Sequence, residues 1–228
     1  MPCTFTISCV VRNKKIKKPK RPQTPGEEKA NALTHALGIV FILVTLPILW
    51  KKAMAHPGPY TLWAVGIYVA GMLAVYISST VYHFLVHPPL KQKAHIADHI
   101  SIFLLIGGTY TPTVYLFTPL RTAVIFLGIM WSIIALGVIL KLFFTGKYNW
   151  LSTLLYLALG WMLVFLVEPL TQTMTSRVFI PILTGGLCYT IGVLFYIQRR
   201  IPYGHAVWHA FVLAGTIAHW VAVYRALG

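Results

Sequence analysis

Three pairs of histidines in this sequence are four residues apart, the spacing that places two imidazole rings on one face of a helix. The pairs are His83 and His87, His95 and His99, and His205 and His209. Three imidazoles without a thiolate are typical of catalytic zinc centres, which keep an open position for water. Taken alone, each pair is a weak signal, because a histidine near a membrane interface is more often solvated or hydrogen-bonded than bound to a metal.

Acidic residues are scarce, and the 228 residues include only Glu27, Glu28, Asp98 and Glu168. Asp98 lies in an apolar stretch, where an ionisable side chain is costly and indicates function by default, although a helix cap would also explain it. Beside a histidine metal site, Asp98 would act as general base. Ser79 lies one turn before His83 and would bond the water or a developing oxyanion, unless it bonds its own helix backbone.

The elements that position these residues are those of a membrane protein, because 57% of the chain is hydrophobic and 10% is charged, against roughly one quarter charged in soluble domains. Apolar stretches cover about 32–50, 60–86, 96–117, 121–140, 149–168, 178–197 and 205–226. Each is long enough to cross a bilayer, and lipid leaves no partner for a free backbone amide. We therefore expect an all-α, polytopic membrane protein with a seven-transmembrane-helix bundle.

The first 30 residues form a separate region, rich in Lys, Arg and Pro, which predicts a disordered basic tail over 1–30 and a membrane domain over 31–228. With the tail inside, 14 of the 19 Lys and Arg residues lie on the inner side and five on the outer side. The positive-inside rule then predicts a multi-pass protein of the cell (inner or plasma) membrane, with a cytoplasmic N-terminus and an outer C-terminus. The net charge of +15 is mainly a topology signal, so no nucleic-acid partner is expected.

This topology brings the candidate residues to one depth. The second span ends near His83, the third begins near Asp98 and the seventh begins at His205, all toward the inner leaflet. We therefore predict that His83, His205 and His209 bind a metal beside Asp98.

The remaining histidines are expected to lie outside this group. His95 follows two lysines and should face the headgroups. His99 remains a competitor because it directly follows Asp98, but it should point largely elsewhere if Asp98 faces the core, because a helix turns ~100° per residue. His219 is about 21 Å farther along its helix than His205 and is expected near the outer side as a hydrogen-bonded packing residue.

Several motifs resemble those of the progestin and adiponectin receptor family. They are Glu28-x2-Asn31-x3-His35, Ser79-x3-His83, Asp98 and His205-x3-His209. The phrases Gly107-Gly108-Thr109-Tyr110-Thr111-Pro112 and His205-Ala206-Val207-Trp208-His209 look closest to its bacterial branch, the hemolysin III proteins. The resemblance covers roughly residues 26–226.

The resemblance implies a seven-helix bundle with a cytoplasmic N-terminus and zinc held by the residues matching His83, His205 and His209. It also implies that Asp98 and Ser79 surround the zinc-bound water. Relatives include alkaline ceramidases, which hydrolyse a lipid amide, so the resemblance suggests membrane hydrolases.

The first motif of the family is matched by Glu28, Asn31 and His35, at the inner end of the first span. We expect these residues to be structural, with Glu28 and Asn31 capping the helix start and bonding neighbouring helices. The chain lacks the large N-terminal region of the animal receptors, which argues against a hormone receptor.

The preferred function is a zinc-dependent hydrolase of a lipid amide or ester at the inner leaflet. One alternative is a sensor or regulator of membrane lipid composition in which zinc is structural. Another is a pore-forming cytolysin, which would need a polar stripe along several helices, whereas the polar residues here gather at one end.

Overall fold

The computed structural model describes residues 21–145, 149–198 and 200–228, and these residues form helices joined by short loops, without a strand. The helices are α1 (Pro25–Ala55), α2 (Thr61–Phe84), α3 (Pro88–Phe117), α4 (Leu120–Phe144), α5 (Asn149–Gly160), the 3₁₀ helix η1 (Met162–Leu166), α6 (Val167–Thr173), α7 (Ser176–Ile197) and α8 (Gly204–Ala226). Within the described ranges, seven helical segments are long and apolar enough to cross a membrane. The expected all-α, multi-pass architecture is therefore confirmed.

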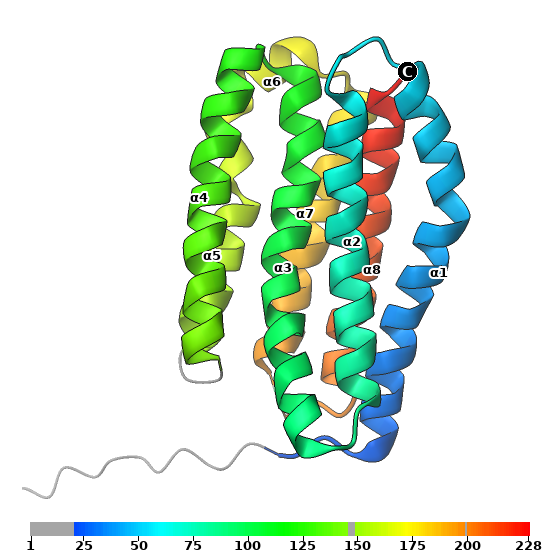
Figure 1. Cartoon of the computed structure of the whole chain (residues 1–228), viewed down its shortest axis with the longest axis vertical. Coiled ribbons are helices and arrows are strands. Elements are labelled where there is room, and N and C mark those ends of the chain that lie inside the picture. Colours follow the sequence, from blue (N-terminus) through cyan, green and yellow to red (C-terminus); the bar gives the residue numbers. More distant parts are fainter. Residues whose placement is uncertain (1–20, 146–148, 199) are drawn as a thin grey trace, which may run out of the picture.

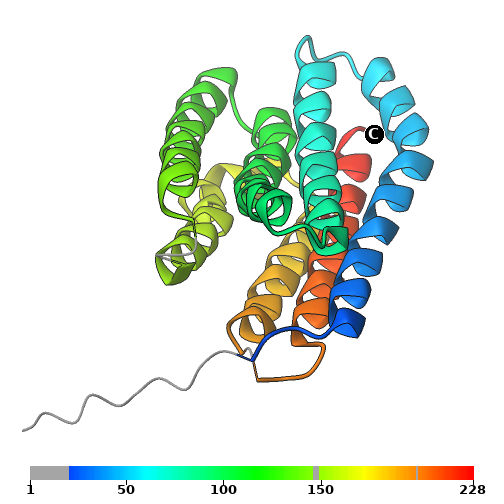
Figure 2. The ribbon, with the colours of Figure 1, turned by 60° about the horizontal axis from the view of Figure 1, so that its bottom comes forward.

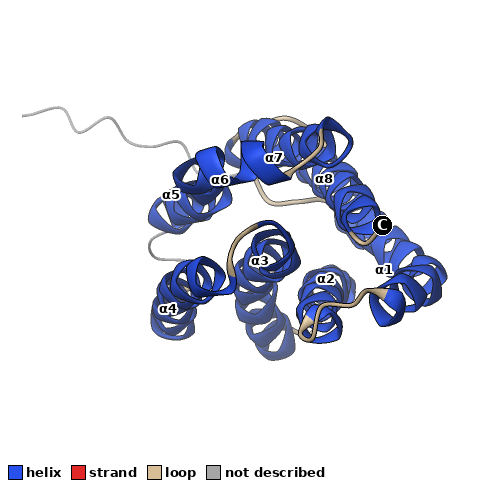
Figure 3. Ribbon diagram, turned by 90° about the horizontal axis from the view of Figure 1, so that it is seen from above, coloured by secondary structure: helices blue, strands red, loops and turns tan. Residues whose placement is uncertain are grey.

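The helices form a ring of two rows (Figure 3), in which α1 to α4 lie along one side and α5, α7 and α8 along the other. In sequence order, α2 packs against α1 and α3, α4 packs against α3, and α8 packs against both α7 and α1. As drawn in Figure 1, α1, α3, α5 and α8 begin at the lower end of the bundle, and the C-terminus lies at the upper end. The turned view (Figure 2) shows the start of α1 and the α7–α8 connection at the same end.

Helix α1 begins earlier than the expected position of about 32, because the residues before it form a complete N-terminal cap. The Glu27 backbone N–H donates to the Thr24 hydroxyl at 3.3 Å, and the Thr24 N–H donates to the Glu27 carboxylate at 2.8 Å. Pro25 occupies the first turn, where its missing N–H costs nothing. Residues 1–20 of the predicted tail lie outside the described residues.

Helices α2 and α3 approach closely through glycine. A Cβ atom on Gly71 would lie 2.5 Å from the Leu104 carbonyl oxygen, and one on Gly108 would lie 3.0 Å from that of Ile67. Small residues allow membrane helices to make such backbone contacts. The close packing holds the lower ends of α2 and α3, which carry His83 and Asp98, side by side.

The fifth crossing is not the single helix expected over 149–168, because it breaks after Gly160 into η1 and α6. Tyr110 of α3 stabilises the break. Its hydroxyl donates to the Gly160 carbonyl oxygen at 2.8 Å and accepts from the Leu163 N–H at 3.1 Å. A distant side chain thus satisfies backbone groups that a broken helix would leave bare in lipid.

Candidate metal centre

Three histidines from two helices meet at the lower end of the bundle. His83 lies in the last turn of α2, and His205 and His209 lie in the first two turns of α8. Each offers a ring nitrogen, and these nitrogens all lie within 4.8 Å of one another. The ring centroids are 5.2 Å apart for His83 and His205, 5.1 Å for His83 and His209, and 4.5 Å for His205 and His209. The structure thus brings together the three histidines that the sequence placed at one depth.

The His83 ring is oriented by Glu28 of α1. Its Nδ1 atom lies 2.6 Å from the Glu28 carboxylate, which can only accept a hydrogen bond when ionised, so Nδ1 carries the proton. The other carboxylate oxygen of Glu28 lies 3.1 Å from Lys91 Nζ. His83 Nε2 is buried without a hydrogen-bond partner among the described residues. This nitrogen keeps its lone pair for a ligand within the histidine group.

The His209 ring is held in the same way by Asn31. Its Nδ1 atom donates to the Asn31 backbone carbonyl at 3.0 Å, which leaves the lone pair on Nε2. The Asn31 side-chain amide donates to the Gln23 side chain at 2.8 Å, tying the segment before α1 to the site. A carboxylate or carbonyl on the outer nitrogen is the usual support of a metal-binding histidine.

His35, the third residue of the first predicted motif, stacks on this group. Its ring lies 3.7 Å from that of His209, centroid to centroid, at an interplanar angle of 19°, and it meets the Tyr76 ring edge-on at 5.0 Å. The side chain is buried, and neither ring nitrogen has a hydrogen-bond partner among the described residues. Its contacts are therefore those of a packing residue behind His209.

Asp98 and Ser79 lie beside the histidines. Asp98 is partly buried on α3 and lines the same cavity as His83. Its carboxylate is near enough to interact with the His83 ring and with the Ser79 hydroxyl. That hydroxyl is fully buried, with the Asp98 carboxylate beside it. The structure thus places a carboxylate and a hydroxyl at the edge of the histidine group.

Two cavity residues, His95 and His99, were expected outside the metal group. Both line the cavity, and their Nε2 atoms lie 3.0 Å apart. His99 is buried, and its backbone carbonyl accepts from the Tyr156 hydroxyl at 2.8 Å. The Tyr82 ring lies between the histidine pair and the metal candidates, 5.0 Å from the His95 ring and 4.6 Å from that of His83. Their i, i+4 spacing was the available signal, but the rotation of α3 about its own axis decides which face borders the cavity.

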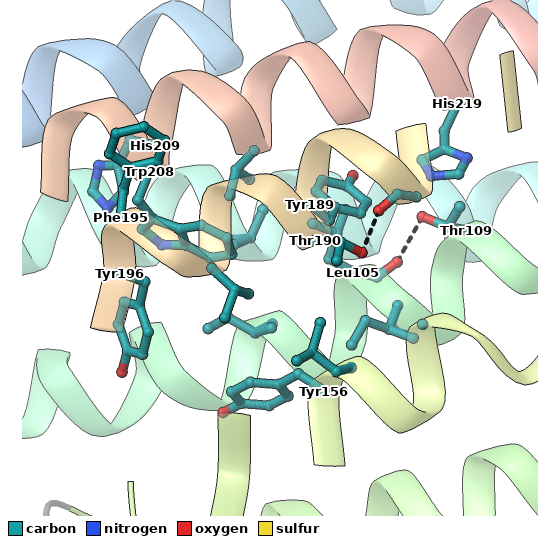
Figure 4. Close-up of a pocket in the computed structure, with 18 of the residues that line it drawn as sticks. Leu105, Thr109, Tyr156, Tyr189, Thr190, Phe195, Tyr196, Trp208, His209 and His219 are labelled. Atoms are coloured by element: carbon teal, nitrogen blue, oxygen red, sulfur yellow. Dashed lines mark hydrogen bonds between the residues drawn. The ribbon is translucent and has the colours of Figure 1, made fainter. Parts of the chain in front are cut away.

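A cavity of about 400 Å³ extends from this site into the bundle, within the usual size range of small-molecule pockets. His209 lies at one end and His219 at the other (Figure 4). The wall between them is mainly apolar and includes Leu105, Ile106, Leu157, Val193 and Val212. The histidine group therefore opens onto a long, largely apolar space.

The donor set fits a divalent metal that prefers imidazole. Three neutral nitrogens can point inward, and two of the three rings have their outer nitrogen paired with an oxygen acceptor. Zinc is commonly bound by three histidines that leave a fourth position open. The buried, unpartnered Nε2 of His83 is the atom that such an ion would satisfy.

In the part of the chain that the structure describes, seven apolar helical segments and a three-histidine group that could hold a metal define a multi-pass membrane protein with a possible metal centre. A family model described as "Haemolysin-III related" matches residues 24–220, so the chain belongs to the hemolysin III family.

Relatives in bacteria and in mammals are similar over most of the chain. A protein of Bacillus subtilis (strain 168), "Hemolysin-3 homolog", is 37% identical over 202 residues, covering 88% of this chain and 94% of the relative. "Hemolysin-3" of Bacillus cereus is 36% identical over 192 residues, covering 83% and 87%. The human "Monocyte to macrophage differentiation factor" is 28% identical over 207 residues, covering 88% and 84%. The similarity to the bacterial branch expected from the motifs is confirmed.

Proposed function

We propose that this protein is a zinc-dependent hydrolase that cleaves an amide or ester bond of a lipid. One observation carries the proposal: three histidine nitrogens converge within 4.8 Å at the polar end of a long apolar cavity. The arrangement combines a site for a metal with a space for a hydrocarbon chain, as cleavage of a lipid requires.

His83, His205 and His209 would hold the zinc ion, and Glu28 and the Asn31 carbonyl would orient two of these rings. When bound, zinc would lower the pKa of a water molecule to about 7 and polarise the substrate carbonyl. Asp98 would act as general base, because its carboxylate lies next to His83 and the cavity.

Ser79 would donate its hydroxyl hydrogen to the oxygen on which negative charge develops. The hydroxyl is buried beside the Asp98 carboxylate at the edge of the histidine group, which is the position that this role requires. For Glu28, Asn31 and His35 we propose a supporting role, since each contacts a histidine and belongs to α1.

We further propose that the lower end of the bundle faces the cytoplasm. The described basic residues of this end are Arg21, Lys29, Lys91, Lys93, Lys141 and Arg200, and residues 1–20 add six more in sequence. The positive-inside rule then favours a cytoplasmic N-terminus and an outer C-terminus. The histidine group would lie at the inner leaflet.

The test combines metal analysis with turnover. We expect near-stoichiometric zinc in the purified protein by elemental analysis, and cleavage of an amide or ester in a screen of lipid substrates. Asp98→Asn should retain the fold and most of the zinc but lose turnover by roughly 100-fold to 10,000-fold. Glu168→Gln is the matched control, because Glu168 is exposed on α6 and lies outside the cavity.

Protein without bound metal would contradict the proposal as a whole. Bound zinc with full function in Asp98→Asn would instead support the second candidate, a lipid sensor with structural zinc. That candidate is favoured by one observation, since the site joins α1, α2 and α8 through Glu28, His83 and His209. Leakage from liposomes that carry the pure protein would support a cytolysin, the activity suggested by the bacterial relatives' names.

A further inference from the structure

His219 of α8 is a buried imidazole that the metal centre does not use. Its side chain is only 7% exposed, and its ring stacks on Tyr189 at 5.4 Å with an interplanar angle of 28°. No hydrogen bond to this imidazole is found within residues 21–145, 149–198 and 200–228. The expected packing role of His219 is therefore confirmed, but the expected hydrogen bond is not found among these residues. Buried polar groups normally have partners, and an imidazole has one donor and one acceptor to satisfy.

The ring is seated by a glycine on the neighbouring helix. A Cβ atom on Gly185 would lie 2.4 Å from His219 Nε2, so α7 accommodates this imidazole only because residue 185 has no side chain. Gly186, by contrast, would place a Cβ in open space. An apolar side chain at position 219 would pack here without leaving a polar atom unpaired. The fold nevertheless makes room for the polar ring of His219.

His219 borders the far end of the cavity, opposite His209 (Figure 4). The two residues are ten positions apart on α8, which corresponds to about 15 Å along a helix. Thr109 and Thr190 also line this end, but their hydroxyl hydrogens are donated to the carbonyls of Leu105 and Gly186, each at 2.8 Å. The Thr190 oxygen already accepts from Trp161 Nε1 at 3.1 Å, so the Thr109 oxygen is the better acceptor for a ligand at this end.

The far end suits a neutral polar group. Among the described residues that line the cavity, the charged ones are Arg21, Glu27 and Asp98, and all three lie at the lower end. An ionised ligand group beside His219 would therefore be desolvated without a counter-charge, whereas a hydroxyl would find both a donor and acceptors. The apolar wall between the two ends fits the hydrocarbon that connects them.

We infer that His219 forms a second polar subsite, which binds a hydroxyl or keto group carried on the hydrocarbon chain of the lipid. An extended chain advances ~1.2 Å per bond, as in an extended backbone, so ~15 Å places this group about a dozen bonds from the reacting carbonyl. The inference rests on the proposed function, because the bonds are counted from the carbonyl that the proposed hydrolase would cleave. It adds that the protein selects oxygenated chains by the position of the oxygen.

The experiment measures binding, so it does not depend on turnover. Dodecanoic acid, 12-hydroxydodecanoic acid and 6-hydroxydodecanoic acid compete with a fluorescent polyene fatty acid for the protein in detergent. We expect wild type to bind the 12-hydroxy acid about 5-fold to 10-fold more tightly than the 6-hydroxy isomer, because one buried hydrogen bond is gained and no hydroxyl faces the apolar wall. His219→Phe should bring this ratio to about one, and His219→Gln should retain part of it.

His87→Phe is the control, because His87 is exposed and does not line the cavity. It should leave the ratio of the two isomers unchanged. The inference is overturned if wild type shows no preference, if His219→Phe keeps the wild-type ratio, or if none of the acids binds. If His219→Phe does not fold, His219→Gln and the wild-type comparison still decide. Absence of metal or of turnover, with the isomer preference intact, would contradict the proposed hydrolase and leave the subsite standing.

Discussion

The two ends of the cavity differ in how their histidines are held. At the lower end, the outer nitrogens of His83 and His209 are paired with Glu28 and with the Asn31 carbonyl. At the upper end, His219 has a stacked tyrosine and a glycine beneath it but no hydrogen bond within the described ranges.

This difference indicates two kinds of ligand. In a ring whose tautomer is set by the protein, the outer nitrogen carries the proton and the inner nitrogen keeps its lone pair. Such a ring suits a permanent partner such as a metal. A ring that can donate or accept through either nitrogen suits an exchangeable neutral group. Substitutions at the two ends should therefore have separable effects.

The largest effect is expected for His209→Ala, compared with His219→Ala. Loss of one of three ligands should remove the zinc and reduce turnover by at least about 1,000-fold, because the site can no longer activate water. His219→Ala should keep stoichiometric zinc. Elemental analysis of both purified variants checks the pair, and equal zinc loss in both would contradict the separation of the two ends.

Glu28→Gln should weaken zinc binding by about 10-fold to 100-fold while leaving the fold intact, because it removes the charge that orients His83. Competition with a chelator of known affinity measures the change. Glu168→Gln, on the exposed surface of α6, makes the same chemical change away from the site and should have no effect. Equal affinity in Glu28→Gln and wild type would show that Glu28 does not support the metal.

At the other end, Gly185→Ala should destabilise the protein by about 2 kcal/mol, because the new methyl group would overlap the His219 ring and force it to move. Gly186→Ala is the neighbouring control, with open space at its Cβ, and should be neutral or slightly stabilising. Thermal unfolding in detergent compares the two. Similar stability of both variants would show that His219 is not confined by Gly185.

The smallest effect is expected for Tyr110→Phe, at about 1–2 kcal/mol of stability, because the backbone groups of Gly160 and Leu163 lose their partner at the break in the fifth crossing. Zinc content should not change, since Tyr110 lies away from the histidine group. Tyr60→Phe, at an exposed tyrosine, serves as control in the same unfolding measurement. A wild-type unfolding temperature for Tyr110→Phe would contradict this account.

Much of the fold follows from composition and spacing. Apolar stretches of about 20 residues must form helices in lipid, so all seven crossings were predicted from sequence. The break after Gly160 was not predicted, because the fifth stretch is one continuous apolar run in the sequence. The groups that make the break tolerable are on Tyr110, fifty residues earlier, and no local pattern reports that contact.

The convergence of His83, His205 and His209 was predicted because topology alone brings the ends of the second and seventh spans to one depth. The roles of Glu28 and Asn31 as partners of particular ring nitrogens were not, since depth does not specify which helix faces meet. His95 and His99 were misplaced for the same reason, because their orientation depends on how α3 is rotated in the bundle.

The sequence by itself determined a seven-helix membrane protein and the histidines that gather at one end, since both follow from hydrophobic length and helical period. Only the tertiary structure decided that these histidines open onto a cavity ending at His219. Most of the cavity wall is built from α3, α5, α7 and α8, whose mutual rotation is set by side-chain packing across the bundle. Periodicity within a single helix carries no information on that rotation.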